Sequence, residues 1–132
     1  DELRGIWRGK RVNNGEWAFG CLVRSSNKTM IFVFDEKTNQ MSGTEVDPST
    51  LGECTGLHDK NGELVFEGDI VKCSRGCPHE VIYVIEHGGM FWGGMPAFYL
   101  SRIREGYAWM GREEIIGNIH DDPELLNNKQ EV

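Results

Sequence analysis

Hydrophobic and polar positions along this chain alternate with the period of short β-strands. Trp17, Phe19, Cys21 and Val23 are separated by single residues, which places these large side chains on one face of a strand. Residues 29–34 form an unbroken apolar run rich in β-formers, which favours a strand covered on both sides. The pattern therefore predicts β structure from the start of the chain.

The segment 55–71 carries the clearest turn signals. Asn61-Gly62 stands between two apolar stretches and favours a tight hairpin, because both central residues of a type I′ turn must accept positive φ. Gly68, between Glu67 and Asp69, offers the same freedom at the next corner. Three strands in so short a segment predict a small, tightly curled β-barrel.

Further strands are expected on both sides of this segment. Pro48 cannot donate to a strand ladder, so we place the boundary between two parts of the chain near residue 50. Asp122-Pro123-Glu124 has the composition of a helix start, with a capping carboxylate followed by proline in the first turn. The expected strands are 3–12, 16–24, 29–34, 44–46, 81–86, 90–93, 96–101 and 115–120.

Three segments carry motifs that resemble a known family. Residues 8–17 match the pattern RGKR…GEW, residues 55–71 match TGLxDKNGxxxxEGDIV, and residues 116–126 match IGNIxxxPELL. These patterns, in this order and spacing, resemble the YopX family of bacterial phage and prophage proteins. His58 and His120 stand where that family often has other residues, and the segment 73–79 is not one of its signatures.

The resemblance implies a β-rich fold with an SH3-like barrel, encoded by a phage or an integrated prophage. It implies no catalytic residues, because the family has no established biochemical activity. With the pattern above, we predict an all-β protein: an N-terminal β-meander in residues 1–50, then an SH3-like β-barrel in residues 51–132 that ends in a short C-terminal helix.

Composition and charge narrow the function classes. The 132 residues have a net charge of −7, and residues 1–50 are neutral while residues 51–132 carry the whole excess of acid. An acidic body argues against a broad phosphate-binding surface. The basic exception is Arg4, Arg8, Lys10 and Arg11, which could contact a nucleic-acid backbone or form a solvated strand edge.

No apolar run approaches the roughly 20 residues of a membrane helix, so we expect no membrane association. No signal-peptide pattern is present at the start, and the four cysteines are too few for a small secreted disulfide scaffold. We therefore expect a cytoplasmic protein with reduced thiols. A domain of this size needs no metal or cofactor for its stability, and we predict none.

Two local groups are candidate binding sites. Cys73, Cys77 and His79 could bind zinc with Cys54 as a fourth ligand, or they could simply lie in a loop between two strands. The glycine-rich segment 88–96 could expose an aromatic loop for a protein partner, formed by Met90, Phe91, Trp92 and Met95. Most other aromatic side chains are expected in the core.

Acidic residues near the turns could do acid–base work, but Asp59, Glu67 and Asp69 have a simpler use. At hairpin corners such carboxylates accept hydrogen bonds from turn amides and stay solvated. No serine or cysteine has the flanking pattern of a nucleophile. We therefore expect that the protein is not an enzyme.

These observations favour an accessory protein of a phage or prophage that binds another macromolecule, and a protein partner rather than nucleic acid. Self-association is a further expectation, because exposed strands of the meander could pair between subunits. One alternative is a nucleic-acid-binding barrel that uses Arg8, Lys10 and Arg11 with Trp7 or Trp17. The second alternative is a zinc-binding protein.

Overall fold

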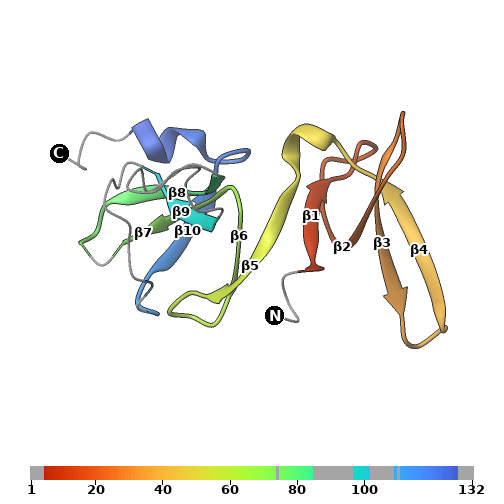
Figure 1. Ribbon diagram of the computed structural model, residues 1–132, viewed down its shortest axis with the longest axis horizontal. Helices are drawn as coiled ribbons and strands as arrows, with labels where there is room; N and C mark the ends of the chain where they lie inside the picture. The colour runs from red at the N-terminus through yellow and green to blue at the C-terminus, as the bar shows by residue number, and fades with distance from the viewer. Residues whose placement is uncertain (1–4, 74, 85–96, 102–108, 110, 128–132) are drawn as a thin grey trace, which may run out of the picture. The chain divides into compact units, whose positions relative to one another are not determined.

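A computed structural model of the chain describes residues 5–73, 75–84, 97–101, 109 and 111–127 (Figure 1). Its strands pair antiparallel in two sheets, and the helical elements among these residues are short 3-10 helices. The prediction of an all-β fold is confirmed. The chain divides into two compact units, Asp1–Gly56 and Leu57–Val132.

The first unit is a meander in which each strand pairs with the next. Its sheet runs in the order β4-β3-β2-β1-β5, and the last residues of β5 belong to the second unit. A 3-10 helix, η2, connects β4 to β5. The elements are β1 (Trp7–Lys10), β2 (Trp17–Arg24), β3 (Thr29–Asp35), β4 (Gln40–Glu45), η2 (Pro48–Thr50) and β5 (Gly52–His58).

A small apolar cluster stabilises one face of the meander. Ala18, Ile31 and Val46 are buried there, with Trp7 and Leu51 packed against them. A single compact row of this kind leaves the other face of the sheet without an equivalent core.

The break predicted at Pro48 is a turn closed by side chains. The Asp47 carboxylate accepts a hydrogen bond from Ser49 N at 3.0 Å, which caps η2. The Thr50 hydroxyl accepts from Lys10 N at 2.9 Å and donates to the Asp47 carbonyl at 2.7 Å. The turn is thereby attached to β1.

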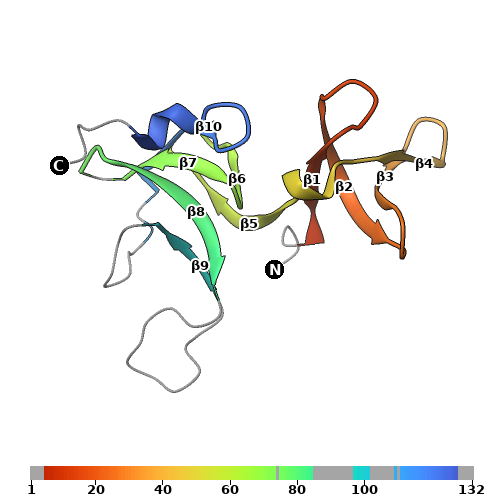
Figure 2. The ribbon, with the colours of Figure 1, turned by 90° about the horizontal axis from the view of Figure 1, so that it is seen from above.

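The second unit contains a four-stranded antiparallel sheet in the order β10-β7-β8-β9. Figure 2 shows β8 alongside β9. A short strand, β6, precedes this sheet and neighbours β5. The elements are β6 (Leu64–Phe66), β7 (Asp69–Lys72), β8 (Pro78–Val84), β9 (Ala97–Leu100), β10 (Glu114–Asn118) and the 3-10 helix η3 (Pro123–Asn127).

The core of the second unit lies on one face of this sheet. Val65, Val71, Cys73, Val81 and Leu100 are buried together, and Cys77, Trp109 and Ile115 pack against them.

The described strands do not close into a barrel, and here the prediction is wrong. Closure requires a hydrogen-bonded partner on both sides of every strand. Within the described part of the second sheet, β10 pairs with β7 alone and β9 with β8 alone. The SH3-like character stays a prediction. The expected C-terminal helix coincides with η3, which is a 3-10 turn rather than an α-helix.

None of the described helices is long and apolar enough to cross a membrane.

Candidate functional site

Asp59 organises the hairpin of the 55–71 motif. Its Oδ1 accepts hydrogen bonds from Asn61 N and Glu63 N, each at 2.9 Å. Its Oδ2 accepts from Ile115 N at 3.0 Å, which attaches the turn to β10. Gly62 completes the turn with a φ of 84°. The carboxylate is therefore fully used in holding backbone, and it is only 5% exposed.

The electrostatics of Asp59 follow from these contacts. Burial alone would raise the pKa of its carboxyl group. The N–H groups of Ile115, Glu63 and Asn61, with the nearby charge of Lys60, outweigh burial and lower the pKa below its usual value. A group with a lowered pKa stays ionised at neutral pH and is a poor general base.

The second corner of the motif has the same design. The Asp69 carboxylate accepts from Phe66 N at 2.7 Å, and Gly68 has a φ of 95°. Gly68 also bonds through its backbone to Val81 O at 2.8 Å and to Ile119 N at 2.9 Å. The predicted hydrogen bonds from turn amides are present. The prediction that these carboxylates stay solvated is wrong for Asp59 and Asp69, which are only 5% and 3% exposed.

The opening and closing motifs are also structural. Gly9 in β1 leaves little room for a side chain, because an added Cβ would meet Val46 at 3.0 Å. The Asn118 side chain accepts hydrogen bonds from His120 N and Asp121 N at 2.9 Å each. The Asp122 carboxylate, expected to cap the final helix, accepts from Asn118 N at 3.3 Å instead. The residues that carry the family resemblance thus fix turns and strand crossings.

Three of the four predicted metal ligands lie together. One ligand atom from each of Cys73, Cys77 and His79 lies within 4.8 Å of the other two. Cys73 and His79 are buried and Cys77 is half-buried. The predicted fourth ligand, Cys54, is not part of this group among the described residues; it lies fully buried in β5 of the first unit. All four cysteines are thiols.

The exposed side of the meander is the second candidate site. Residues paired across antiparallel strands, and residues two apart along a strand, share a face. The pairs Cys21–Phe32 and Phe34–Met41 therefore place β2, β3 and β4 side chains on one face. We call this set the aromatic face: Trp17, Phe19, Cys21 and Val23 of β2, Phe32 and Phe34 of β3, and Met41 of β4.

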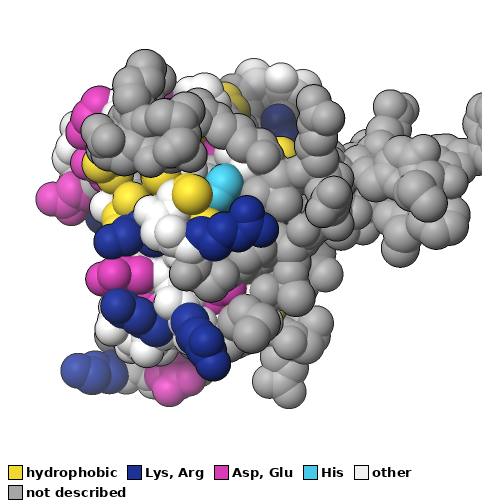
Figure 3. Space-filling view, turned by 90° about the vertical axis from the view of Figure 1, so that its left-hand side faces the viewer, with side chains coloured by type: hydrophobic (Ala, Val, Ile, Leu, Met, Phe, Trp, Pro, Cys, Tyr) yellow, Lys and Arg dark blue, Asp and Glu magenta, His cyan; other side chains and the backbone are white. Residues whose placement is uncertain are grey.

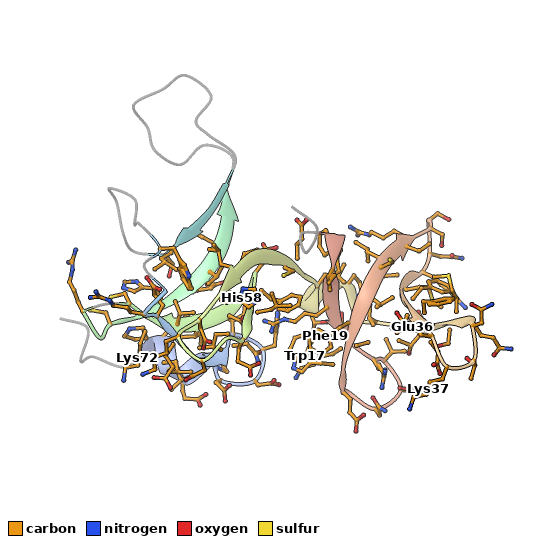
Figure 4. All side chains as sticks on the ribbon, turned by 90° about the horizontal axis from the view of Figure 1, so that it is seen from below. Trp17, Phe19, Glu36, Lys37, His58 and Lys72 are labelled. Carbon is orange, nitrogen blue, oxygen red and sulfur yellow. The ribbon has the colours of Figure 1, made fainter. Side chains whose placement is uncertain are left out.

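The aromatic face exposes a large share of its apolar side chains to solvent. Phe19, Val23 and Phe34 are each about half exposed (48, 49 and 50%), and Met41 is 58% exposed. The ring of Phe32 lies over Gly43, where an added Cβ would come within 2.6 Å of it. Figure 4 shows Trp17 and Phe19 near each other in the first unit. The prediction that residues 29–34 are covered on both sides is therefore wrong.

The predicted basic residues lie at one end of the aromatic face. Arg8 and Lys10 are paired with Phe19 and Trp17 across the β1–β2 ladder. The Arg8 guanidinium carbon is 4.6 Å from the centre of the Trp17 ring, and Lys10 Nζ is 5.4 Å from it. Arg11 forms an ion pair with Glu16 at 3.8 Å. Arg4 lies outside the described residues.

The predicted aromatic loop, Met90, Phe91, Trp92 and Met95, lies outside the described residues. Sequence reasoning missed Phe32, Phe34 and Met41 as surface residues. The sequence carried only a weak signal for them. Gly43 has no side chain, and on a strand next to two closely spaced phenylalanines a glycine leaves room for an aromatic ring.

Comparisons with known proteins bear on the whole chain. The family model described as YopX protein matches residues 7–127. Among solved structures, the crystal structure of protein EF1440 from Enterococcus faecalis superimposes with a TM-score of 0.57. Its sequence is 22% identical, and the match covers 91% of this chain and 96% of that one. At this identity the likeness shows the fold. A search of curated proteins found no match.

Proposed function

The chain belongs to the YopX family, and from this premise we propose that it is a phage or prophage accessory protein that binds another protein through the aromatic face of its first unit. The phage setting rests on the family resemblance. The binding activity rests on one observation: a sheet face of the meander that exposes large apolar side chains from three adjacent strands.

The extent of the patch supports this proposal. Phe19, Val23, Phe34 and Met41 together expose on the order of 350 Å² of side chain, given typical full areas for such residues. Patches of this size on a monomer are often functional. A standard interface needs about 800 Å² on each partner, so the aromatic face would be the centre of an interface with a polar rim.

The charges around the patch favour a partner of defined chemistry. Lys10 lies over the Trp17 ring at one end of the face, so a complementary surface is apolar with a carboxylate at that end. A second copy of this chain fits less well, because each copy carries a net charge of −7 and two copies would repel.

Nucleic acid is the weaker alternative for the same face. Arg8 is only 7% exposed, and Arg11 is paired with Glu16. Phosphate binding needs accessible cationic groups, whose contacts make affinity fall steeply with salt.

The expectation that the protein is not an enzyme is part of the proposal. It is supported by the use of the buried motif carboxylates Asp59 and Asp69 as acceptors of backbone N–H groups. A carboxylate fixed in this way is not available to move a proton for a substrate.

The test compares matched baits in extracts of bacteria in which a prophage encoding the protein has been induced. The baits are the wild-type chain, the double variant Phe19→Ser/Phe34→Ser, and the control variant Leu57→Ser, which changes a 38% exposed apolar residue of the second unit. We expect a protein that is retained by the wild type and the control and lost from the double variant. After purification, this partner protein should bind the double variant at least tenfold more weakly than it binds the wild type.

Three results would contradict the proposal. One is an identical set of proteins on all three baits. Another is nucleic acid alone, released by nuclease or by salt. The third is a homodimer, seen by light scattering, that the double variant abolishes; the face would then be occupied by a second copy.

A further inference from the structure

The β7–β8 hairpin places three soft ligands on one face by its register alone. Lys72 pairs with Pro78 and Val71 with His79, so Cys73 and Cys77 stand opposite each other at the end of the ladder. The backbone agrees, since Cys73 N donates to Cys77 O at 2.9 Å. His79 lies two residues beyond Cys77 and therefore faces the same side.

That side is the core side of the sheet. Val71 and Cys73 are both members of the buried cluster of the second unit, and Cys77 packs against it. The ligand atoms of Cys73, Cys77 and His79 lie within 4.8 Å of one another. Tetrahedral zinc, with Zn–S and Zn–N bonds of about 2.3 and 2.0 Å, needs ligand atoms roughly 3.5–3.8 Å apart. Small side-chain adjustments are enough to reach that spacing.

The histidine is held in the tautomer that a metal requires. Its Nδ1 lies 2.6 Å from the carbonyl oxygen of Ser101. A carbonyl can only accept, so Nδ1 donates to it, which leaves Nε2 as the ring atom that could coordinate a metal. Metal-bound histidines characteristically donate their other ring N–H to a carbonyl or carboxylate in this way.

The cysteine turn has a second feature suited to a metal. Arg75 N lies 3.4 Å from Cys73 Sγ and donates a hydrogen bond to it, which orients this sulfur within the turn. Gly76 has a φ of 92° and donates to Cys73 O at 2.9 Å, which closes the turn between the two cysteines. Figure 3 looks onto the second unit, where hydrophobic side chains lie among lysine and arginine side chains.

We propose that Cys73, Cys77 and His79 form a zinc site with three protein ligands and a fourth position for water. Two thiolates and a neutral imidazole balance the charge of Zn²⁺, so the complex is neutral at a site where two of the three ligands are buried. The ion would join the two strands at the turn end of the β7–β8 hairpin, while His79 keeps its contact with the Ser101 carbonyl. This site is independent of the aromatic face.

The experiment uses the full chain without an affinity tag, purified under reducing conditions without chelator. Metal content is measured directly, and cobalt is then titrated into the metal-free protein. We expect one zinc per chain, and with cobalt the thiolate charge-transfer and visible bands typical of a tetrahedral site. A chelator should lower the melting temperature of the wild type by several degrees.

Matched variants separate the site from the other thiols and imidazoles. Cys77→Ser and His79→Asn should each weaken cobalt binding at least tenfold and abolish the chelator effect on melting. Cys21→Ser and His58→Asn change an exposed thiol and an exposed imidazole, and Cys54→Ala changes the buried thiol of β5; all three should bind as the wild type does. Because Cys77 is only half-buried, Cys77→Ser is expected to fold.

The proposal is overturned by a wild-type chain that contains no zinc and gives no cobalt bands under reducing conditions. It is also overturned by binding that survives Cys77→Ser, or by a Cys54→Ala variant that loses the metal. A mass consistent with a Cys73–Cys77 disulfide in protein kept reduced throughout would refute it as well.

Discussion

The two units differ in where they place their large apolar residues and their carboxylates. In the first unit, a small core of Ala18, Ile31 and Val46 lies under one face of the sheet, while aromatic residues stand on the other. In the second unit, the carboxylates of Asp59 and Asp69 are buried and hold turns. The difference teaches that the motif residues of the second unit maintain its fold, whereas the exposed apolar face lies in the first unit.

The largest expected effect on stability is that of removing the Asp59 carboxylate. Asp59→Ala leaves three backbone donors, on Asn61, Glu63 and Ile115, without their acceptor. At about 1 kcal/mol for each of these half-buried hydrogen bonds, the second unit should lose about 3 kcal/mol. Amide hydrogen exchange in residues 57–73 would measure it. Asp59→Asn keeps one acceptor oxygen and should lose less; a loss equal to that of Asp59→Ala would show that the retained oxygen contributes nothing.

The next effect separates the two faces of one strand. Ile31→Ala opens a cavity in the core of the first unit and should lower its free energy of unfolding by about 3 kcal/mol. Phe34→Ala, three residues further along β3, removes a half-exposed ring and should cost under about 1 kcal/mol. Hydrogen exchange in residues 17–46 reports both. A large cost for Phe34→Ala would mean that its face is part of a core.

Lowering the pH should change the stability of the second unit in two opposite steps. Burial raises the pKa of Glu80 above its usual 4.5, so this group favours the folded state when protonated, and its contribution is lost as pH rises through the raised pKa. The pKa of Asp59 is lowered below 3.8, so its contribution is present above that value and is lost as pH falls through the lowered pKa.

Unfolding of the second unit, followed by denaturant from pH 7 to pH 2, should therefore show a slight gain in stability toward pH 4.5 and a loss below about pH 4. Glu80→Gln should remove the gain, and Asp59→Asn should flatten the loss. A wild-type profile without any acid loss would contradict the role given to Asp59.

The smallest effect concerns the neighbour of Asp59 in the same motif. Lys60 Nζ lies 3.3 Å from a Glu114 carboxylate oxygen, but both side chains are substantially exposed, at 50 and 37%. Solvent screens such pairs, so Lys60→Ala should cost under about 1 kcal/mol, measured by the same exchange experiment. A loss as large as that of Asp59→Ala would break the distinction between buried and exposed motif residues.

The sequence was sufficient for the turns because few residues accept the backbone conformations that turns require. Gly62 and Gly68 have φ values of 84° and 95°, and the chain reverses at Asn61-Gly62 as predicted. Asn61 does not have a positive φ, so the prediction of a type I′ turn is wrong. The family was predicted for the same reason, since its motifs are largely these corners. The burial of two motif carboxylates was not predictable: Asp59 and Asp69 were expected in solvent and are buried. Asp59 bonds to Ile115, which is distant in sequence, and local spacing carries no information on such a contact.

The faces of the meander show where sequence reasoning ends. Alternation correctly put Trp17, Phe19 and Val23 on one side of β2, but period alone does not tell which side is covered. For the metal ligands, local spacing predicted Cys73, Cys77 and His79 because one hairpin holds them. The assignment of Cys54 depended on a distant strand, and spacing carries no information on such a placement.

The position of Cys21 offers a practical handle on the first unit. It is the only exposed thiol of the four cysteines, and it belongs to the aromatic face. A maleimide dye would attach there first, in an otherwise native chain, with the fluorophore seated among the phenylalanines. A change in the emission of the dye, or a slower rate of attachment, would then report in real time that a partner has bound to that side of the sheet.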